Sequence, residues 1–178
     1  MDISELTEVY QAGRHLQAKE IVSLEALVEA NPDDLISRIR LLGYYRFNYK
    51  LDSPRYANHL LWIVDKLPDD PVADFVALGN SGLKRQNKKA YDLVKERWLL
   101  QVEASSASPI VSINASTFCQ TNGDRRSALE MLIKAQALYP TNTRILLHLA
   151  GLYQGAANNT ESLEKALHCY ERLSLIHI

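Results

Sequence analysis

Few residues in this sequence would interrupt a helix or hold a small domain together covalently. Among its 178 residues are seven glycines, six prolines and two cysteines. Sustained alternation of apolar and polar residues, which is typical of half-buried strands, is missing. No stretch approaches the ~18 apolar residues of a membrane-spanning helix. Residues Met1–Glu5 contain neither the basic leader nor the apolar run of a secretory signal. The sequence therefore predicts an all-α, cytoplasmic protein with no membrane partner.

An excess of charge of one sign is missing as well. Twenty basic residues stand against 21 acidic residues, which gives a net charge of -1 at pH 7. Binding of nucleic acid or anionic lipid driven by the charge of the whole protein is therefore not expected. The hydrophobic content of 47% and the charged content of 23% are ordinary for folded proteins, which argues against global disorder.

The sequence also lacks the motifs of metal, cofactor and catalytic sites. It contains no His-Glu-x-x-His, no Gly-x4-Gly-Lys, no Gly-x-Ser-x-Gly and no Cys-x2-Cys pattern. The neighbours His168 and Cys169 diverge by about 100° on a helix, so they cannot pair as base and nucleophile. Cys119 and Cys169 match no metal spacing, and we predict two buried thiols in a reducing compartment. We expect no metal, no cofactor and no enzymatic activity.

Signals for helix starts recur along the chain. Ser53-Pro54, Asp70-Pro71 and Ser108-Pro109 each place a capping side chain before a proline, which fits a position where no backbone donor is needed. The acidic pair Asp69-Asp70 suits a helix start, because the helix dipole favours negative charge there. Asn122-Gly123 predicts a tight turn between helices. With the apolar periodicity, these signals predict helices over 3–11, 15–30, 34–47, 54–67, 71–80, 86–103, 109–121, 124–138, 143–154 and 160–172.

Residues 109–170 contain two consecutive helix-pair units with related spacings. Their shared apolar, small and aromatic positions are Ala128, Leu132, Ala135, Pro140, Leu149, Ala150, Tyr153, Ala166 and Tyr170. This pattern resembles the tetratricopeptide repeat (TPR), in which a Leu-small pair and a Tyr on one helix meet an Ala-x3-aromatic on the next. The resemblance is best over 109–142 and 143–172 and weakens toward the N-terminus. It implies a divergent, right-handed α-α superhelix of about four to five helix pairs over residues 1–172.

A second resemblance, to a group of bacterial repeat proteins, is carried by three helical segments. These segments are Leu41–Tyr45, His59–Val64 and Asn114–Phe118. No activity is established for that group, so this resemblance bears on the fold alone. A solenoid of stacked helix pairs is a binding scaffold, and we expect a protein or peptide as its partner.

The TPR resemblance places four residues on the concave groove. In some TPR adaptors, Lys, Asn and Arg on successive first helices hold the C-terminal carboxylate of a partner. The corresponding positions are Asn80, Asn114, Arg144 and His148, although Val76 stands where the first Lys belongs and a neutral His148 would bind a carboxylate poorly. We expect polar contacts from these four residues to a peptide or helix in the groove. The alternative is that Asn80 caps a helix end and Arg144 is simply solvated.

A second candidate surface combines cations with aromatic rings, which can contact phosphates and stack on bases. Its residues are Arg38, Arg40, Tyr45, Arg46 and Lys50. They make an RNA-binding helical repeat the alternative function. Nucleic acid is the less favoured partner, because the tyrosine spacing in this segment also suits packing between helices.

The last six residues, Leu173–Ile178, coincide with one translated frame of a transposase library adapter. The amphipathic pattern of the preceding helix stops where they begin. We therefore expect residues 173–178 to be a non-native tail on a metagenomic gene fragment. A third alternative for the function follows, in which the helix pairs are the repeat portion of a larger enzyme or regulator.

A solenoid that ends on an uncovered helix pair should associate with itself through that pair. No polar capping helix follows Glu171, so the last pair is expected to leave an apolar face open. Sedimentation equilibrium should then show an average mass that rises with protein concentration. A monomer at high concentration, with firm hydrogen-exchange protection across residues 160–172, would contradict this expectation.

Overall fold

The computed structural model describes residues 2–79, 81–104, 108–155 and 160–176. These residues form an all-α fold without strands, which confirms the predicted class for the described part of the chain. Its elements are α1 (Ile3–Ala12), the 3-10 turn η1 (Gly13–His15), α2 (Ala18–Ala30), α3 (Leu35–Phe47), α4 (Pro54–Lys66), α5 (Pro71–Gly79), α6 (Leu83–Gln86), α7 (Lys88–Ala104), α8 (Pro109–Thr121), α9 (Arg125–Leu138), α10 (Thr143–Gln154) and α11 (Thr160–Ile176). Within these ranges, no helix is both long and apolar enough to cross a bilayer.

The predicted helix boundaries agree with the observed ones to within a few residues, with one omission. The short helix α6 precedes α7, where the sequence predicted a single helix over 86–103. The predicted tight turn is confirmed, since Gly123 adopts the left-handed conformation with φ of 73°. Chain reversals are therefore well predicted by their local residues, whereas the extra turn of helix at α6 is not.

The capping predictions are confirmed in part. Asp70 accepts a hydrogen bond from the backbone N–H of Val72 at 2.8 Å, as a capping side chain should. Ser53 and Ser108 directly precede the prolines that begin α4 and α8, but neither side chain makes a capping hydrogen bond. Proline at the first helical position is thus the more reliable of the two start signals here.

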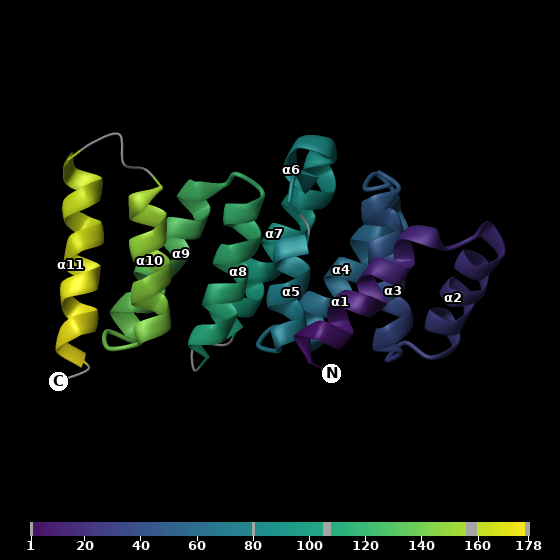
Figure 1. The fold of residues 1–178 in the computed structure, drawn as a ribbon, viewed down its shortest axis with the longest axis horizontal. Helices are drawn as coiled ribbons and strands as arrows, with labels where there is room; N and C mark the ends of the chain where they lie inside the picture. The colour runs from purple at the N-terminus through teal and green to yellow at the C-terminus, as the bar shows by residue number, and fades with distance from the viewer. Residues whose placement is uncertain (1, 80, 105–107, 156–159, 177–178) are drawn as a thin grey trace.

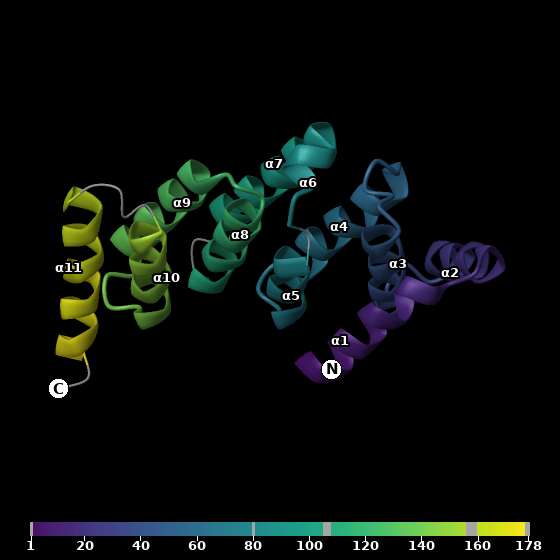
Figure 2. The ribbon, with the colours of Figure 1, turned by 45° about the horizontal axis from the view of Figure 1, so that its top comes forward.

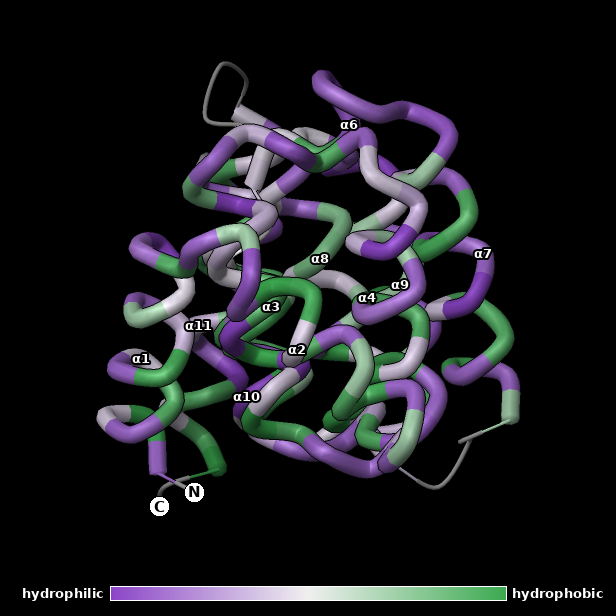
Figure 3. The backbone as a smooth tube through the Cα atoms, turned by 90° about the vertical axis from the view of Figure 1, so that its right-hand side faces the viewer, coloured by the Kyte–Doolittle hydropathy of each residue, from purple (hydrophilic) through white to green (hydrophobic). Residues whose placement is uncertain are grey.

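The helices follow one another along one long axis, from α2 and α3 at one end to α11 at the other (Figure 1). Helices α5, α8 and α10 lie in one layer, and α4, α7 and α9 form a second layer, drawn above the first in Figure 2. One continuous apolar core runs from Leu6 of α1 to Cys169 of α11. Viewed along the array from the α2 end, outer turns such as those of α6 and α7 are largely hydrophilic (Figure 3). The apolar core thus lies between the helices, and hydrophilic residues predominate on these outer turns.

Two helices depart from simple stacking of consecutive pairs. Helix α2 packs on α3, and its Glu25 side chain also contacts His59 and Arg55 of α4, whereas α1 crosses α3 and reaches α5 (Figures 1 and 2). In the same way, α7 packs on α4, α6 and α8 but not on α5. Consecutive TPR-like pairs would join 3–11 with 15–30 and 71–80 with 86–103, and neither pair packs together among the described residues. In the first case α1 packs on α3 and α5 instead of α2, and in the second the short helix α6 lies between α5 and α7 in the chain.

Two glycines allow α1 and η1 to lie directly against the backbone of α3. A Cβ atom built on Gly43 would lie 2.0 Å from the carbonyl oxygen of Tyr10, and one on Gly13 would lie 2.2 Å from that of Arg40. Both distances are far below van der Waals contact, so a larger residue fits at neither position. The Tyr10 ring then packs edge-on against Phe75 of α5, with ring centroids 5.5 Å apart. These contacts fix the direction of α1 across the array.

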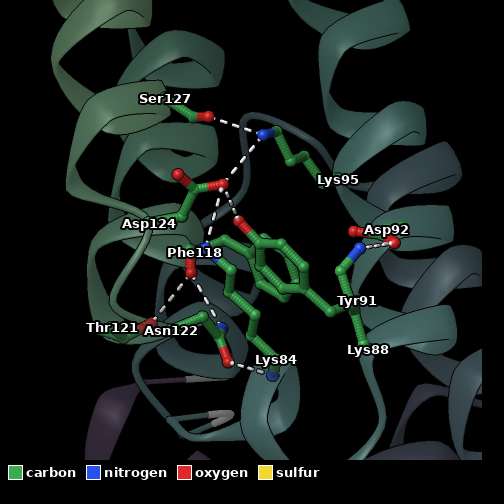
Figure 4. Close-up of polar contacts among 10 residues, drawn as sticks. All are labelled: Lys84, Lys88, Tyr91, Asp92, Lys95, Phe118, Thr121, Asn122, Asp124 and Ser127. Atoms are coloured by element: carbon green, nitrogen blue, oxygen red, sulfur yellow. Dashed lines mark hydrogen bonds and ion pairs between the residues drawn. The ribbon is translucent and has the colours of Figure 1, made fainter.

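A polar cluster joins α7 to the turn between α8 and α9 (Figure 4). Asp124 accepts hydrogen bonds from the Tyr91 hydroxyl at 2.6 Å and from Lys95 Nζ at 2.8 Å. Lys95 also donates to Ser127 at 2.5 Å, and Lys84 Nζ lies 3.7 Å from the same Asp124 oxygen. Burial alone would raise the pKa of Asp124, but the hydrogen bonds from Lys95, Tyr91 and Ser127 outweigh it and hold this pKa well below its ordinary value. The charged carboxylate of Asp124, at the start of α9, thus holds α6 and α7 against this end of α9.

The expected tail at 173–178 lies partly within α11. This helix continues to Ile176, with Leu173 buried and Leu175 70% exposed. His177 and Ile178 lie outside the described residues. Three large side chains that share one exposed face of α11 are Leu163, Leu167 and Tyr170. This stripe is the surface to which the self-association prediction refers.

Gly43→Ala should destabilise the protein by about 1–3 kcal/mol, because the added methyl group meets the backbone of Tyr10 and displaces α1. Equilibrium unfolding in urea measures the change. The matched control is Gly151→Ala in α10, where no atom outside the helix's own backbone lies within 4 Å of the new methyl group. That control should raise the free energy of unfolding by about 0.5–1 kcal/mol. Stabilisation of both variants would show that α1 and α3 are not in backbone contact.

Candidate functional site

A groove of about 290 Å³ lies between the start of α1 and helices α5, α8 and α10. Its apolar lining includes Ile3, Phe75, Leu78 and Ile110. Ile3 is 67% exposed and Leu78 is 55% exposed. The groove therefore offers apolar surface that the chain itself leaves uncovered, at a place where four helices meet.

The polar lining of the groove is dominated by carboxylates. Asp69, Asp70 and Asp74 line it, together with Asn114 and Arg144. Asp70, Asp74 and the apolar Leu78 follow one another at intervals of four residues, so they share one face of α5 and its start. No described residue forms an ion pair with any of the three carboxylates. Arg144 is the cation among the described lining residues.

Asn114 lies at the bottom of the groove and is only 1% exposed. Its Nδ2 donates a hydrogen bond of 2.9 Å to the carbonyl oxygen of Pro68, which ties α8 to the turn before α5. Because a carbonyl oxygen requires a donor, this contact fixes the orientation of the amide. The Oδ1 atom is buried and accepts no hydrogen bond. Asn114 therefore presents an unused acceptor rather than the donor that capture of a carboxylate requires.

Arg144 and His148 lie one turn apart on α10. Arg144 is exposed at the groove, and His148 is half-buried behind it. Burial lowers the pKa of His148 below its ordinary value of 6.5, Asp74 acts in the opposite direction, and the Arg144 charge lowers it further. His148 is therefore neutral at pH 7. The fourth predicted residue, Asn80, lies outside the described residues.

The predicted site was thus incomplete. The structure brings Asn114 and Arg144 to one groove, with His148 within electrostatic reach of Asp74. Asp74, Phe75 and Leu78 were missed, because carboxylates in the first turn of a helix and apolar residues along it have a structural explanation. The usable signal was the four-residue spacing that places Asp74 beneath Asp70 on the same face.

The basic and aromatic residues considered for RNA do not form one exposed surface. Arg38 is 6% exposed, donates from Nε and Nη2 to the carbonyl oxygen of Pro32 at 3.0 and 2.7 Å, and lies over the Trp62 ring. Tyr45 is 5% exposed, and its hydroxyl donates to Glu25 at 2.5 Å. Both side chains are therefore occupied within the core, since buried polar groups need partners.

Of the other three residues of that surface, Arg46 and Lys50 each donate a hydrogen bond within the protein. Arg46 Nε donates to the carbonyl oxygen of Gly79 at 3.0 Å, which links α3 to the end of α5. Lys50 is exposed, and its Nζ donates to the Tyr44 hydroxyl at 2.5 Å. Arg40 is half-buried, and its Nε has no hydrogen-bond partner. Arg46 lines a hollow with Arg14, Phe47 and Tyr49, whereas Arg38 and Tyr45 are buried and do not line it.

Both cysteines are free and buried, as predicted. Burial raises the pKa of the Cys119 thiol to about 11, and it raises that of Cys169 above its ordinary value. Both thiols are therefore protonated at neutral pH, which makes them poor nucleophiles. In the described ranges, no group of three or more His, Cys, Asp or Glu side chains is placed to hold a metal ion.

Comparisons of this chain with protein-family models, with curated proteins and with solved structures found no match. The class that the fold defines is accordingly a broad one, an all-helical array with packed layers of helices. Any more specific assignment depends on the geometry of the groove.

The titration of His148 reports on this geometry. Its ring pKa, measured by NMR, should lie below 6.5. Asp74→Asn should lower this pKa further because an attractive charge is lost, whereas Arg144→Ala should raise it because a repulsive charge is lost. Asp52→Asn, an exposed change in the turn between α3 and α4, is the control and should leave it unchanged. A pKa that responds to neither groove variant would contradict the described placement of Asp74 and Arg144.

Proposed function

We propose that this protein is a non-catalytic interaction scaffold, a divergent TPR-like solenoid that holds a peptide or helix of a protein partner in the groove between α1, α5, α8 and α10. The observation that carries the proposal is the groove itself. It combines uncovered apolar side chains with the Oδ1 atom of Asn114, which has no hydrogen-bond partner among the described residues. A cytoplasmic location forms part of the same proposal.

The packing of the C-terminal half supports the repeat architecture. Helix α5 packs on α8, and α8 packs on α10, while α9 and α11 complete the two hairpins of residues 109–142 and 143–172. In a TPR solenoid the first helices of successive units line the inner surface, and in the proposed solenoid these first helices are α5, α8 and α10. The groove therefore lies where such a solenoid would hold its ligand.

Affinity in this proposal comes mainly from apolar contact. Leu78 and Ile3 offer side chains that lose water on binding, and Phe75 provides a half-buried ring between them. Arg144 donates to a carbonyl oxygen of the bound segment, which fixes its position along the groove. Since the helices around the groove are already packed on one another, binding changes the scaffold little.

Selection of a random dodecapeptide library on the immobilised chain, followed by fluorescence polarisation with the recovered peptides, tests the proposal. Leu78→Ala and Arg144→Ala should each weaken binding by about 1–2 kcal/mol, because each removes a groove contact without opening the core. The matched controls are Leu27→Ala on α2, where Leu27 is 51% exposed, and Arg126→Ala on α9. Failure to recover any binding peptide, or equal effects of groove and control variants, would overturn the proposal.

A further inference from the structure

The groove has a strong preference for positive charge built into its lining. Asp69, Asp70 and Asp74 carry three negative charges that no described residue pairs, and Arg144 supplies one positive charge. His148 contributes no charge at pH 7. A ligand that enters with a carboxylate would meet net repulsion, whereas a cation would meet net attraction.

The start of α5 does not reverse this preference. A helix N-terminus carries roughly half a positive charge and free backbone donors. Here the backbone N–H of Val72 donates to the Asp70 side chain at 2.8 Å, and that of Ala73 donates to the Asp70 carbonyl oxygen at 2.9 Å. These donors are already used by the chain. The second oxygen of Asp70 and both oxygens of Asp74 have no hydrogen-bond donor among the described residues.

Asn114 gives independent evidence for a donor ligand. Its Oδ1 is buried at the bottom of the groove without a hydrogen-bond partner, while its Nδ2 is held by the Pro68 carbonyl oxygen. A buried acceptor left unpaired is destabilising, because the lost hydrogen bonds to water are not replaced. A ligand that donates a hydrogen bond to Oδ1 recovers that cost, and a carboxylate cannot do so because it has no proton to donate.

We infer that the groove selects a peptide segment with a lysine or arginine side chain, received between Asp70, Asp74 and the Oδ1 atom of Asn114. The aliphatic stem of that side chain packs on Phe75 and Leu78. The inference rests on the proposed function and specifies its ligand. It also replaces the carboxylate-binding role that the sequence resemblance implied for Asn114, Arg144 and His148.

The test compares synthetic forms of one recovered dodecapeptide. The first form keeps the basic residue of the peptide. The second replaces it by norleucine, which has an apolar stem but no charge, and the third replaces it by glutamate. On the wild-type chain, norleucine should weaken binding about tenfold, glutamate should weaken it further, and 0.5 M salt should weaken only the basic peptide. Asp74→Asn should weaken the basic peptide about tenfold and leave the norleucine peptide unchanged. Asp52→Asn is the charge-matched control and should alter neither.

Unfolding in urea shows whether Asp74→Asn remains folded, which is expected because Asp74 makes no ion pair with a described residue. Peptides that bind equally well with norleucine or glutamate, and that still depend on Leu78, would overturn the inference and leave the proposed function standing. Equal losses for basic and norleucine peptides on Asp74→Asn would also overturn it. The absence of any binding peptide would overturn both.

Discussion

Direct backbone contact between α1 and α3 determines how one end of the helical array is built. Gly43 lets the carbonyl of Tyr10 approach α3 to a distance that any side chain would prevent, and Gly13 does the same one turn further on. Because α1 is held there, it cannot form a hairpin with α2 and instead extends toward α5. Its first residue, Ile3, then becomes part of the groove wall. A steric condition at two glycines thus shapes a surface several turns away.

Polar side chains in the rest of the array mostly hold helices to one another. Asp124 joins α7 to the turn between α8 and α9, and Tyr45 reaches Glu25 across α2 and α3. Arg38 donates a hydrogen bond to the carbonyl oxygen of Pro32 and lies over the ring of Trp62. In the described part of the chain, the buried polar atoms without a hydrogen-bond partner are Arg40 Nε, the Tyr56 hydroxyl, Asn114 Oδ1 and Thr117 Oγ1. Of these, the Asn114 atom belongs to a residue that lines the groove, together with Asp69, Asp70 and Asp74.

The sequence predicted the helices well because their ends depend on local chemistry. Proline at a first helical position and Gly123 at a turn act within a few residues of themselves, so no knowledge of the fold is needed. The diverted course of α1 could not be predicted, because Gly13 and Gly43 act on each other across 30 residues of chain. Alignment of the repeats with the TPR pattern placed Asn114 and Arg144 in the groove. It could not show that the Asn114 side chain donates a hydrogen bond to the carbonyl oxygen of Pro68. Likewise, the burial of Arg38 depends on partners from separate segments.

The path of α1 also bears on the order in which the protein assembles. Most contacts in the array join helices that are neighbours in sequence, a topology that favours fast folding. The hydrogen bond from the Tyr10 hydroxyl to the Gly79 carbonyl instead spans 69 residues, so docking of α1 on α5 closes a long loop at a cost in chain entropy. Because Ile3 reaches the groove through this long-range docking, we expect that wall of the groove to form later than the local helix hairpins.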